Sequence, residues 1–389
     1  MHPLLILLVF VVCCAQALAT PFKPDSDSEV LEVLPRSLGE ADAGLSELQK
    51  QLAADPRNAD LAAELAARYI ELARSESDPR YAGYAQAALG PWWGLDRPPA
   101  RMLLLRATLR QHRHEFAQAI DDLEALVKLA PRDSQAWLTL ATIYQVRGEY
   151  TKAKAACSVL ARTAPLELAT VCHSAVMSVT GQAERAYRLL TGLAPRIRNS
   201  TPGMRQWLTT LMAETAWRLG KTDHAESHFT DALTVGRRDP YLLGVYADFL
   251  LAEQRPHEAL ALLADEARDD SLLLRLAIVA KRAGAQQTAR EHRELLSLRF
   301  TEAQLRGDQR HLRERAWHAL EFNGDPQQAL ELARRNWQEQ KEPLDAWLYM
   351  RAARDAREDV TVRAAQDWIT QWGLQDPNIA ALTSRQERG

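Results

Sequence analysis

Apolar and polar positions alternate with a helical period along most of the chain. From Ser37 onward, segments of about a dozen residues repeat apolar side chains at spacings of three and four, which is the pattern of amphipathic helices. Ala and Leu dominate these segments, whereas Val, Ile and Thr are sparse, and this composition favours helix over strand. We therefore predict an all-α protein.

Small residues recur at a nearly constant interval within the predicted helices. They are spaced by 30 to 40 residues, and the positions are Ala119, Ala153, Ala186, Ala225, Ala259, Ala289 and Ala329. Glycines that suit turns recur nearby, at Gly148, Gly181, Gly220, Gly284 and Gly324. A period near 34 with two helices per unit indicates a solenoid, in which each helical pair buries its apolar face against the next pair.

The clearest unit, residues 134–167, resembles the tetratricopeptide repeat. Its matching residues are Trp137, Leu140, Ala141 and Tyr144 in the first helix, Gly148 in the turn, and Ala153 and Pro165 in and after the second helix. The resemblance is strong over residues 100–167, covers roughly residues 58–375, and weakens toward the C-terminus, where the unit boundaries after residue 270 are not defined. It implies a right-handed α-solenoid of antiparallel helix pairs.

The N-terminus has the features of an export signal. Leu4–Val12 is an apolar run too short to span a bilayer, and Ala17–Ala19 forms an A-x-A cleavage site. We predict a signal peptide over residues 1–19, a flexible leader over residues 20–36, and a periplasmic protein without a transmembrane segment after cleavage. Lipid anchoring through Cys13 or Cys14, or an uncleaved N-terminal anchor, is the alternative. The leader and first unit resemble those of uncharacterised exported bacterial tetratricopeptide proteins. This resemblance does not imply any activity.

The predicted repeat domain covers residues 37–375 and is followed by a polar tail over residues 376–389. Trp368 and Trp372 are four residues apart, so they share one helix face and can seal the last pair. Trp92 and Trp93 lie in a Pro-rich link between units. Either they pack over the junction, or they form an exposed aromatic anchor for a partner.

The chain offers few candidates for chemistry. We find no phosphate-binding glycine motif, no nucleophile elbow and no C-x-x-C, and the net charge of −3 argues against nucleic-acid binding. His224 and His228 share a helix face but lack the glutamate and third ligand of a zinc helix, so we expect a solvated face there. We expect Asp121–Asp122 and Asp269–Asp270 to cap helices or add surface charge. No enzyme activity, metal or cofactor is predicted.

Two cysteines remain after the predicted signal cleavage. Cys157 lies eight residues before Pro165 and Cys172 seven residues after it, so antiparallel helices turning at Pro165 place them at similar heights. In an oxidising compartment such a pair forms a disulfide if the Cβ atoms also approach each other. The alternative is two separate buried thiols that pack as hydrophobic side chains.

The remaining candidate site is the groove formed by the first helices of the units. The predicted groove residues are Arg101, Gln135, Leu138, Thr142, Gln145, Trp207, Glu214, Tyr241 and Asp248. Their mixed polar and apolar character suits a protein or an extended peptide. The sequence favours an exported, non-enzymatic scaffold acting in envelope assembly or in maturation of a partner. A cell-envelope enzyme accessory, a metal- or cell-wall-related protein, and a self-assembling solenoid are the alternatives.

Overall fold

The computed structural model describes residues 38–76, 78, 80–305 and 311–384. The predicted signal peptide and the predicted leader both lie outside these residues. The chain divides into two compact units, residues 1–50 and 51–389, and helix α1 (Leu38–Ala54) spans their boundary. All further description concerns the second unit, in which the described residues contain helices and no strand.

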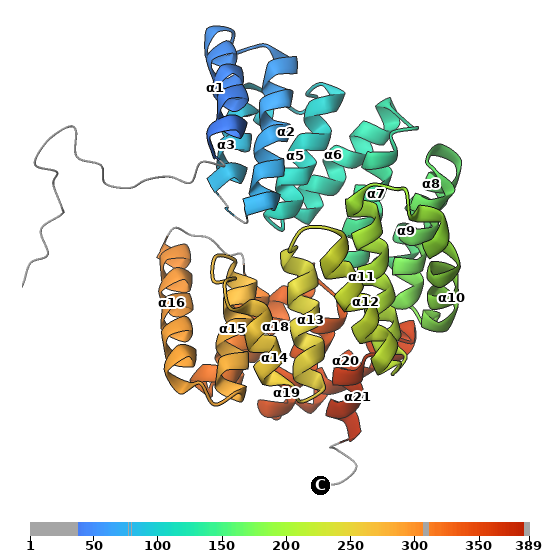
Figure 1. Cartoon of the computed structure of the whole chain (residues 1–389), viewed down its shortest axis with the longest axis vertical. Helices are drawn as coiled ribbons and strands as arrows, with labels where there is room; N and C mark the ends of the chain where they lie inside the picture. The colour runs from blue at the N-terminus through green and yellow to red at the C-terminus, as the bar shows by residue number, and fades with distance from the viewer. Residues whose placement is uncertain (1–37, 77, 79, 306–310, 385–389) are drawn as a thin grey trace, which may run out of the picture. The chain divides into compact units, whose positions relative to one another are not determined.

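The second unit is built of consecutive helices that pack as neighbours along the chain (Figure 1). The pairs are α2 (Ala59–Glu76) with α3 (Arg80–Ala88), α5 (Ala100–His112) with α6 (Phe116–Leu129), α7 (Ser134–Val146) with α8 (Tyr150–Thr163), α9 (Leu166–Ser178) with α10 (Ala183–Leu193), α11 (Pro202–Arg218) with α12 (Thr222–Val235), α13 (Pro240–Ala252) with α14 (Pro256–Leu263), α15 (Asp270–Arg282) with α16 (Gln286–Leu305), α17 (Leu312–His318) with α18 (Pro326–Glu339), and α19 (Pro343–Asp355) with α20 (Asp359–Trp372). Short elements join or follow these pairs: α4 (Gly90–Trp93), the 3-10 helix η1 (Ala194–Ile197), the π-helical stretch η2 (Ala319–Asn323) and α21 (Pro377–Ser384). The prediction of an all-α solenoid of antiparallel, tetratricopeptide-like helix pairs is confirmed.

The small residues that define the repeat are buried where the two helices of each pair meet. Six of the seven have no exposed surface, and Ala289 is 5% exposed. A larger side chain at these positions would push the helices apart, because protein interiors are close-packed. The register that we inferred from the spacing of these alanines is therefore confirmed.

The turn between the helices of a pair adopts a left-handed backbone conformation. Gly148, Gly181, Gly220 and Gly284 have φ between 69° and 80°. The same type of turn occurs where the sequence offers no glycine, at His114, Gln254 and Arg357, with φ of 59° to 60°. Non-glycine residues adopt this conformation at a cost. The turn geometry is thus retained in units whose glycine signal has been lost.

Aspartates cap the N-termini of several first helices. Asp133 accepts a hydrogen bond from the Ala136 N–H (2.9 Å), and Asp269 accepts one from the Leu272 N–H (3.0 Å). Such side chains satisfy donors that the helix itself leaves free. The expectation that Asp269 caps a helix is confirmed.

Asp122 has a different role from the one expected. It is only 4% exposed and accepts hydrogen bonds from Arg106 Nη2 (2.6 Å) and Arg110 Nη1 (2.7 Å). The expectation of a cap or a solubilising surface charge was wrong for this residue, because the charge of Asp122 compensates two guanidinium groups within the α5/α6 pair.

The same buried arginine holds the link that contains the paired tryptophans. Arg106 Nη1 donates to the carbonyls of Trp92 (3.2 Å), Trp93 (2.7 Å) and Leu95 (2.8 Å). The Arg110 guanidinium lies 5.7 Å from the centre of the Trp93 ring, within the range of a cation–π interaction. Both tryptophans are half-buried at this junction.

The C-terminal residues differ from the predicted polar tail. Residues 377–384 form helix α21, in which Ile379 is 4% and Leu382 9% exposed. Arg354 of α19 donates a hydrogen bond to the Leu382 carbonyl, and α21 packs against α19. The predicted tail is therefore corrected over these residues, because their apolar side chains cover the last helical pair.

Candidate partner-binding face

The first helices of several successive pairs contribute side chains to the same small cavity. A small cavity of about 30 Å³ is bounded by side chains from α7, α9, α11 and α13, by Tyr150 at the start of α8, and by Glu342 and Pro343 at the start of α19. Gln145, Glu214 and Tyr241 of the predicted groove are among its lining residues. Because they come from three different helical pairs, the sequence-based assignment of the first helices to one face agrees with the geometry of the cavity.

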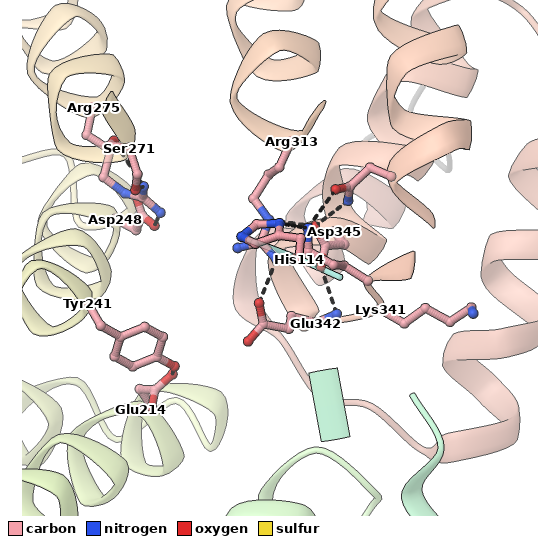
Figure 2. A network of polar contacts seen from close by, with 12 residues as sticks. His114, Glu214, Tyr241, Asp248, Ser271, Arg275, Arg313, Lys341, Glu342 and Asp345 are labelled. Atoms are coloured by element: carbon pink, nitrogen blue, oxygen red, sulfur yellow. Dashed lines mark hydrogen bonds and ion pairs between the residues drawn. The ribbon is translucent and has the colours of Figure 1, made fainter. Parts of the chain in front are cut away.

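Glu214 and Tyr241 form the polar part of this cavity. The Tyr241 hydroxyl donates to Glu214 Oε1 (2.9 Å), to which Arg218 Nη2 also donates (3.2 Å), and Figure 2 shows the Tyr241 ring directed toward Glu214. Glu214 is 8% exposed, whereas Tyr241 is 55% exposed, so the tyrosine presents its ring while its hydroxyl is engaged. Desolvation of the hydroxyl and the neighbouring Glu214 carboxylate raise the pKa of Tyr241 well above its ordinary value. Tyr241 is therefore a neutral hydrogen-bond donor with an accessible aromatic face.

The other predicted groove residues fall into two groups. Arg101, Gln135 and Thr142 are exposed, and Leu138 and Trp207 are half-buried. Asp248 is engaged, because Arg275 donates to both of its carboxylate oxygens (2.9 and 2.8 Å) and both side chains are largely buried. Asp248 therefore ties α13 to α15 and presents little charge to a ligand.

A second polar network, which the sequence did not indicate, centres on Arg313 and Asp345 (Figure 2). Arg313 donates to Asp345 Oδ1 (2.6 Å) and Oδ2 (2.7 Å) and to Glu342 Oε2 (2.5 Å). Asn336 Nδ2 also donates to Asp345 Oδ1 (2.7 Å). Burial raises the pKa of Glu342, and Arg313 opposes this shift. These contacts join the residues between α18 and α19 to α17.

His114 joins this network from a distant pair. Its Nδ1 lies 3.1 Å from Gln340 Nε2, and Figure 2 places it beside Arg313 and Glu342. Desolvation lowers the pKa of His114 to about 4, so the ring is neutral at pH 7 and Nδ1 can accept the amide hydrogen. His114 is thus an exposed residue of the α5–α6 turn that also contacts the residues between α18 and α19.

The ion pairs that sequence analysis did not indicate share a recognisable spacing. Arg313 and Asp345 are 32 residues apart, and Arg275 and Asp248 are 27 apart. Each separation is close to one repeat, which brings the two residues to adjacent first helices. An arginine and an aspartate separated by about one repeat length are thus the signal that could have identified these networks.

Cys157 and Cys172 lie on the adjacent helices α8 and α9. The structure joins them in a disulfide with a Cα–Cα distance of 5.7 Å, and their exposed fractions are 0% and 4%. This separation lies in the usual range for a disulfide. The bond links one helical pair to the next, and its formation in the isolated protein stays a prediction.

His224 and His228 both lie near Tyr187. The Tyr187 hydroxyl is 3.0 Å from His228 Nε2, and the ring of His224 lies edge-on to Tyr187 with centroids 6.5 Å apart. Within residues 38–384, apart from the gaps given above, no group of three or more His, Cys, Asp or Glu side chains is arranged to hold a metal ion. The two histidines therefore contribute to an aromatic contact between α10 and α12.

The helices of the described chain include none that is both long and apolar enough to cross a membrane. The helix pairing, the small buried residue in each pair and the left-handed turns define an α-solenoid that resembles the tetratricopeptide repeat family. No family model and no curated protein matches the chain.

Solved structures with similar folds include tetratricopeptide repeat proteins. A tetratricopeptide repeat protein from Parabacteroides merdae is 15% identical, with 62% of this chain and 94% of that chain covered and a TM-score of 0.45. The type IV pilus biogenesis factor PilW is 16% identical, with 53% and 95% covered and a TM-score of 0.41. Human IFIT1 is 11% identical, with 86% of each chain covered and a TM-score of 0.48. Nothing about function follows from likenesses at this level, and the fold assignment rests on the helical pairs themselves.

Proposed function

We propose that this chain is an exported, non-enzymatic scaffold that binds another protein, or an extended peptide, on the face formed by its first helices. The observation that carries the proposal is the common cavity lined by Gln145, Glu214 and Tyr241, with an accessible tyrosine ring beside a carboxylate. A mixed polar and aromatic surface formed by successive helices suits a ligand that runs across several units. Envelope assembly, or maturation of the bound protein, is the role we propose for it.

Export is the second part of the proposal, and its support is the apolar N-terminal run followed by Ala17–Ala19. We place the protein in the periplasm, with anchoring through Cys13 or Cys14 as the alternative. The intact mass of protein recovered from the envelope decides between them. A chain that starts at Thr20 supports cleavage and release, whereas a lipid-modified cysteine or a retained Met1 would move the protein to an anchored class.

Site-specific photo-crosslinking tests the binding face directly. A crosslinking amino acid is placed at Thr142 or Gln135, which are exposed on α7, and at Lys128, which is exposed on α6, the second helix of its pair. We expect Thr142 and Gln135 to capture the same polypeptide in envelope extracts and Lys128 to capture none. Capture only of a second copy of this chain would favour self-assembly. Equal capture from Lys128 would show that the first helices are not the specific binding face.

The contribution of Tyr241 is measured next, with the polypeptide that the crosslink identifies. Tyr241→Ala removes the accessible ring, and we expect at least about a tenfold loss of affinity, as for an aromatic residue at the centre of an interface. Leu129→Ala on α6 is the matched control, since Leu129 is 68% exposed on the second helix of its pair. Equal affinities of the two variants would show that the partner does not contact the Tyr241 ring.

A further inference from the structure

The residues between α18 and α19 lie against the turn between α7 and α8, which is far away in sequence. The Lys341 N–H donates to the Val146 carbonyl (2.7 Å), and the Tyr150 hydroxyl donates to the Lys341 carbonyl (3.2 Å). Arg147 Nη1 lies 2.7 Å from Glu339 Oε2. Both main-chain groups of Lys341 are thus satisfied by another helical pair, which is how a groove holds a bound peptide.

The end of α20 makes a second contact with the same region. The Tyr150 ring lies 4.8 Å from Trp372 and 6.0 Å from Trp368, measured between ring centroids. A Cβ added at Gly373 would lie only 3.1 Å from the Gly181 Cα, so the two turns touch through their backbones. The two tryptophans, which were expected to seal the last pair, thus also pack on Tyr150 of α8.

The residues that follow the helical Glu339 have the conformation of an extended ligand. Gln340 and Glu342 both have extended backbone angles, with φ and ψ of −129° and 135° and of −77° and 165°. Glu342 also lines the cavity that contains Gln145, Glu214 and Tyr241. One end of the proposed partner-binding face is therefore already occupied by the chain itself.

The segment is joined to the α7–α8 turn by two hydrogen bonds of Lys341 and one ion pair, whereas its bonds to Arg313 lie within α17–α19 and are kept when it leaves that turn. The Arg147–Glu339 ion pair is half-exposed on the Glu339 side, and such pairs contribute little to stability. Helices α18 and α19 pack on each other and on α17 and α20, so these pairs keep their own neighbours when the segment leaves the α7–α8 turn. Local openings of this kind occur in folded proteins without global unfolding.

We propose that Glu339–Glu342 is a releasable latch that occupies, in cis, a peptide site on the α7–α8 turn. The partner that replaces it is an extended acidic segment, with a carboxylate for Arg147 and main-chain donor and acceptor groups for Val146 and Tyr150. This proposal rests on the proposed function, because the latch regulates a site only if the chain binds a partner. Opening of the latch can be measured without any partner, so the latch proposal and the proposed binding function can fail separately.

Hydrogen exchange of the Lys341 amide tests whether the latch opens. A latch predicts that this amide exchanges at least about tenfold faster than the slowest amides of α7 and α19, because it is released by local opening. Exchange of the Lys341 amide at the rate of those core amides would mean that it is freed only by global unfolding, and would overturn the proposal.

A matched pair of glycine variants tests the mechanism of closure. Gly373→Ala and Gly324→Ala place alanine in almost the same left-handed conformation, with φ of 62° and 63° and ψ of 33° and 29°. The new Cβ meets the Gly181 Cα only in Gly373→Ala, since nothing lies within 4 Å at Gly324. We expect faster exchange of the Lys341 amide, by about tenfold, only in Gly373→Ala. Equal exchange of the Lys341 amide in both variants would show that the contact between Gly373 and Gly181 does not help to keep the latch closed.

If Gly373→Ala does not fold, Tyr150→Phe serves the same purpose. It removes the hydroxyl that donates to the Lys341 carbonyl, and Tyr144→Phe, which removes a hydroxyl bonded to Glu124, is the control. We expect faster exchange of the Lys341 amide only in Tyr150→Phe. The same rate in both variants would show that the tyrosine does not hold the latch.

A synthetic peptide with the sequence of residues 337–345, WQEQKEPLD, probes the site in trans. The affinity of a site scales with the fraction of molecules in which it is free. We therefore expect about tenfold tighter binding to the opened variant than to Gly324→Ala, and weaker binding of the same peptide with glutamine in place of Glu339. A peptide that binds all variants equally, or none of them, would overturn the assignment of the α7–α8 turn as a peptide site.

Discussion

Arg106 and Asp122 form a bidentate ion pair inside the α5/α6 pair, with N–O distances of 2.9 and 2.6 Å. Their side chains are 6% and 4% exposed. Because Arg110 bonds the same carboxylate and Arg106 also binds three carbonyls of the preceding link, one aspartate supports the junction between the first two pairs.

Asp122→Asn leaves the buried Arg106 and the half-buried Arg110 without their shared counter-charge. Breaking a buried ion pair by removing one partner typically costs about 3–5 kcal/mol, and we expect a loss of that order in the free energy of unfolding. Urea denaturation measures it, with Asp121→Asn at the exposed neighbouring position as the control. Equal stability of the two variants would show that the buried network contributes little.

The second prediction concerns Cys157 and Cys172. The bond closes a loop of 15 residues, for which the chain-entropy model gives about 3 kcal/mol of stabilisation. Alkylation without reductant, followed by peptide mass mapping of protein from its native compartment, should find both cysteines protected. Reduction should then lower the unfolding midpoint to that of the Cys157→Ala/Cys172→Ala variant. Two freely alkylated cysteines would show that the bond does not form.

The third prediction concerns the closest approach of two helices. Ala153 has no exposed surface, so Ala153→Leu forces extra methyl groups into a filled space, at a cost of about 1–3 kcal/mol. Ala155→Leu makes the same substitution two residues later on the exposed side of α8 and should cost much less. Thermal or urea unfolding compares the two variants. A similar small effect at both positions would mean that Ala153 is not at a helix crossing.

The fourth prediction concerns acid stability. Burial, with a smaller effect of Arg293, lowers the pKa of His318 to about 4, and its Nε2 lies 3.2 Å from Ser297 Oγ. In the unfolded chain the pKa of histidine is about 6.5, so between these values only the unfolded state binds the proton. The stabilisation is therefore complete above about pH 6.5 and is lost as the pH falls toward 4, by about 3 kcal/mol.

His318→Phe is the variant that isolates this effect, because the ring is packed between Phe300 and Phe322 and a phenyl group keeps the aromatic contacts. We expect the free energy of unfolding of His318→Phe to fall less steeply between pH 6.5 and pH 4 than that of the wild type. Carboxylates titrate in both proteins, so the difference between the two curves is the quantity to compare. Parallel curves would show that the protonation of His318 does not control acid stability.

The sequence predicted the helical pairs well because their determinants are local. A buried alanine and a left-handed turn are set by residues within one unit, so their spacing is visible as a period. The same turn is also made without glycine, as at His114 and Gln254, where the recurring alanine of the unit still marks the helical pair. The weakening of the pattern toward the C-terminus accompanies less regular pairs, in which α14 has 8 residues, α16 has 20, and α17 is followed by the π-helical stretch η2.

The candidate site was predicted only in part, for a physical reason. Glu214 and Tyr241 could be placed because both lie on the inner positions of first helices. The packing of Lys341 on Val146 could not be predicted, since it depends on the accumulated rotation of all the pairs between them rather than on any local pattern. Each of those pairs adds a small rotation that the residue types do not specify.

The contact between Tyr150 and Lys341, 191 residues apart, changes how this solenoid can vary in length. In an open repeat array each unit touches only its neighbours, so a whole unit can be inserted or deleted without disturbing the rest. Here, the loss or gain of one helical pair anywhere from α9 to α18 would carry Lys341 away from the α7–α8 turn. The number of pairs in this interval is therefore constrained, and natural or engineered length variants should gain and lose units only outside it.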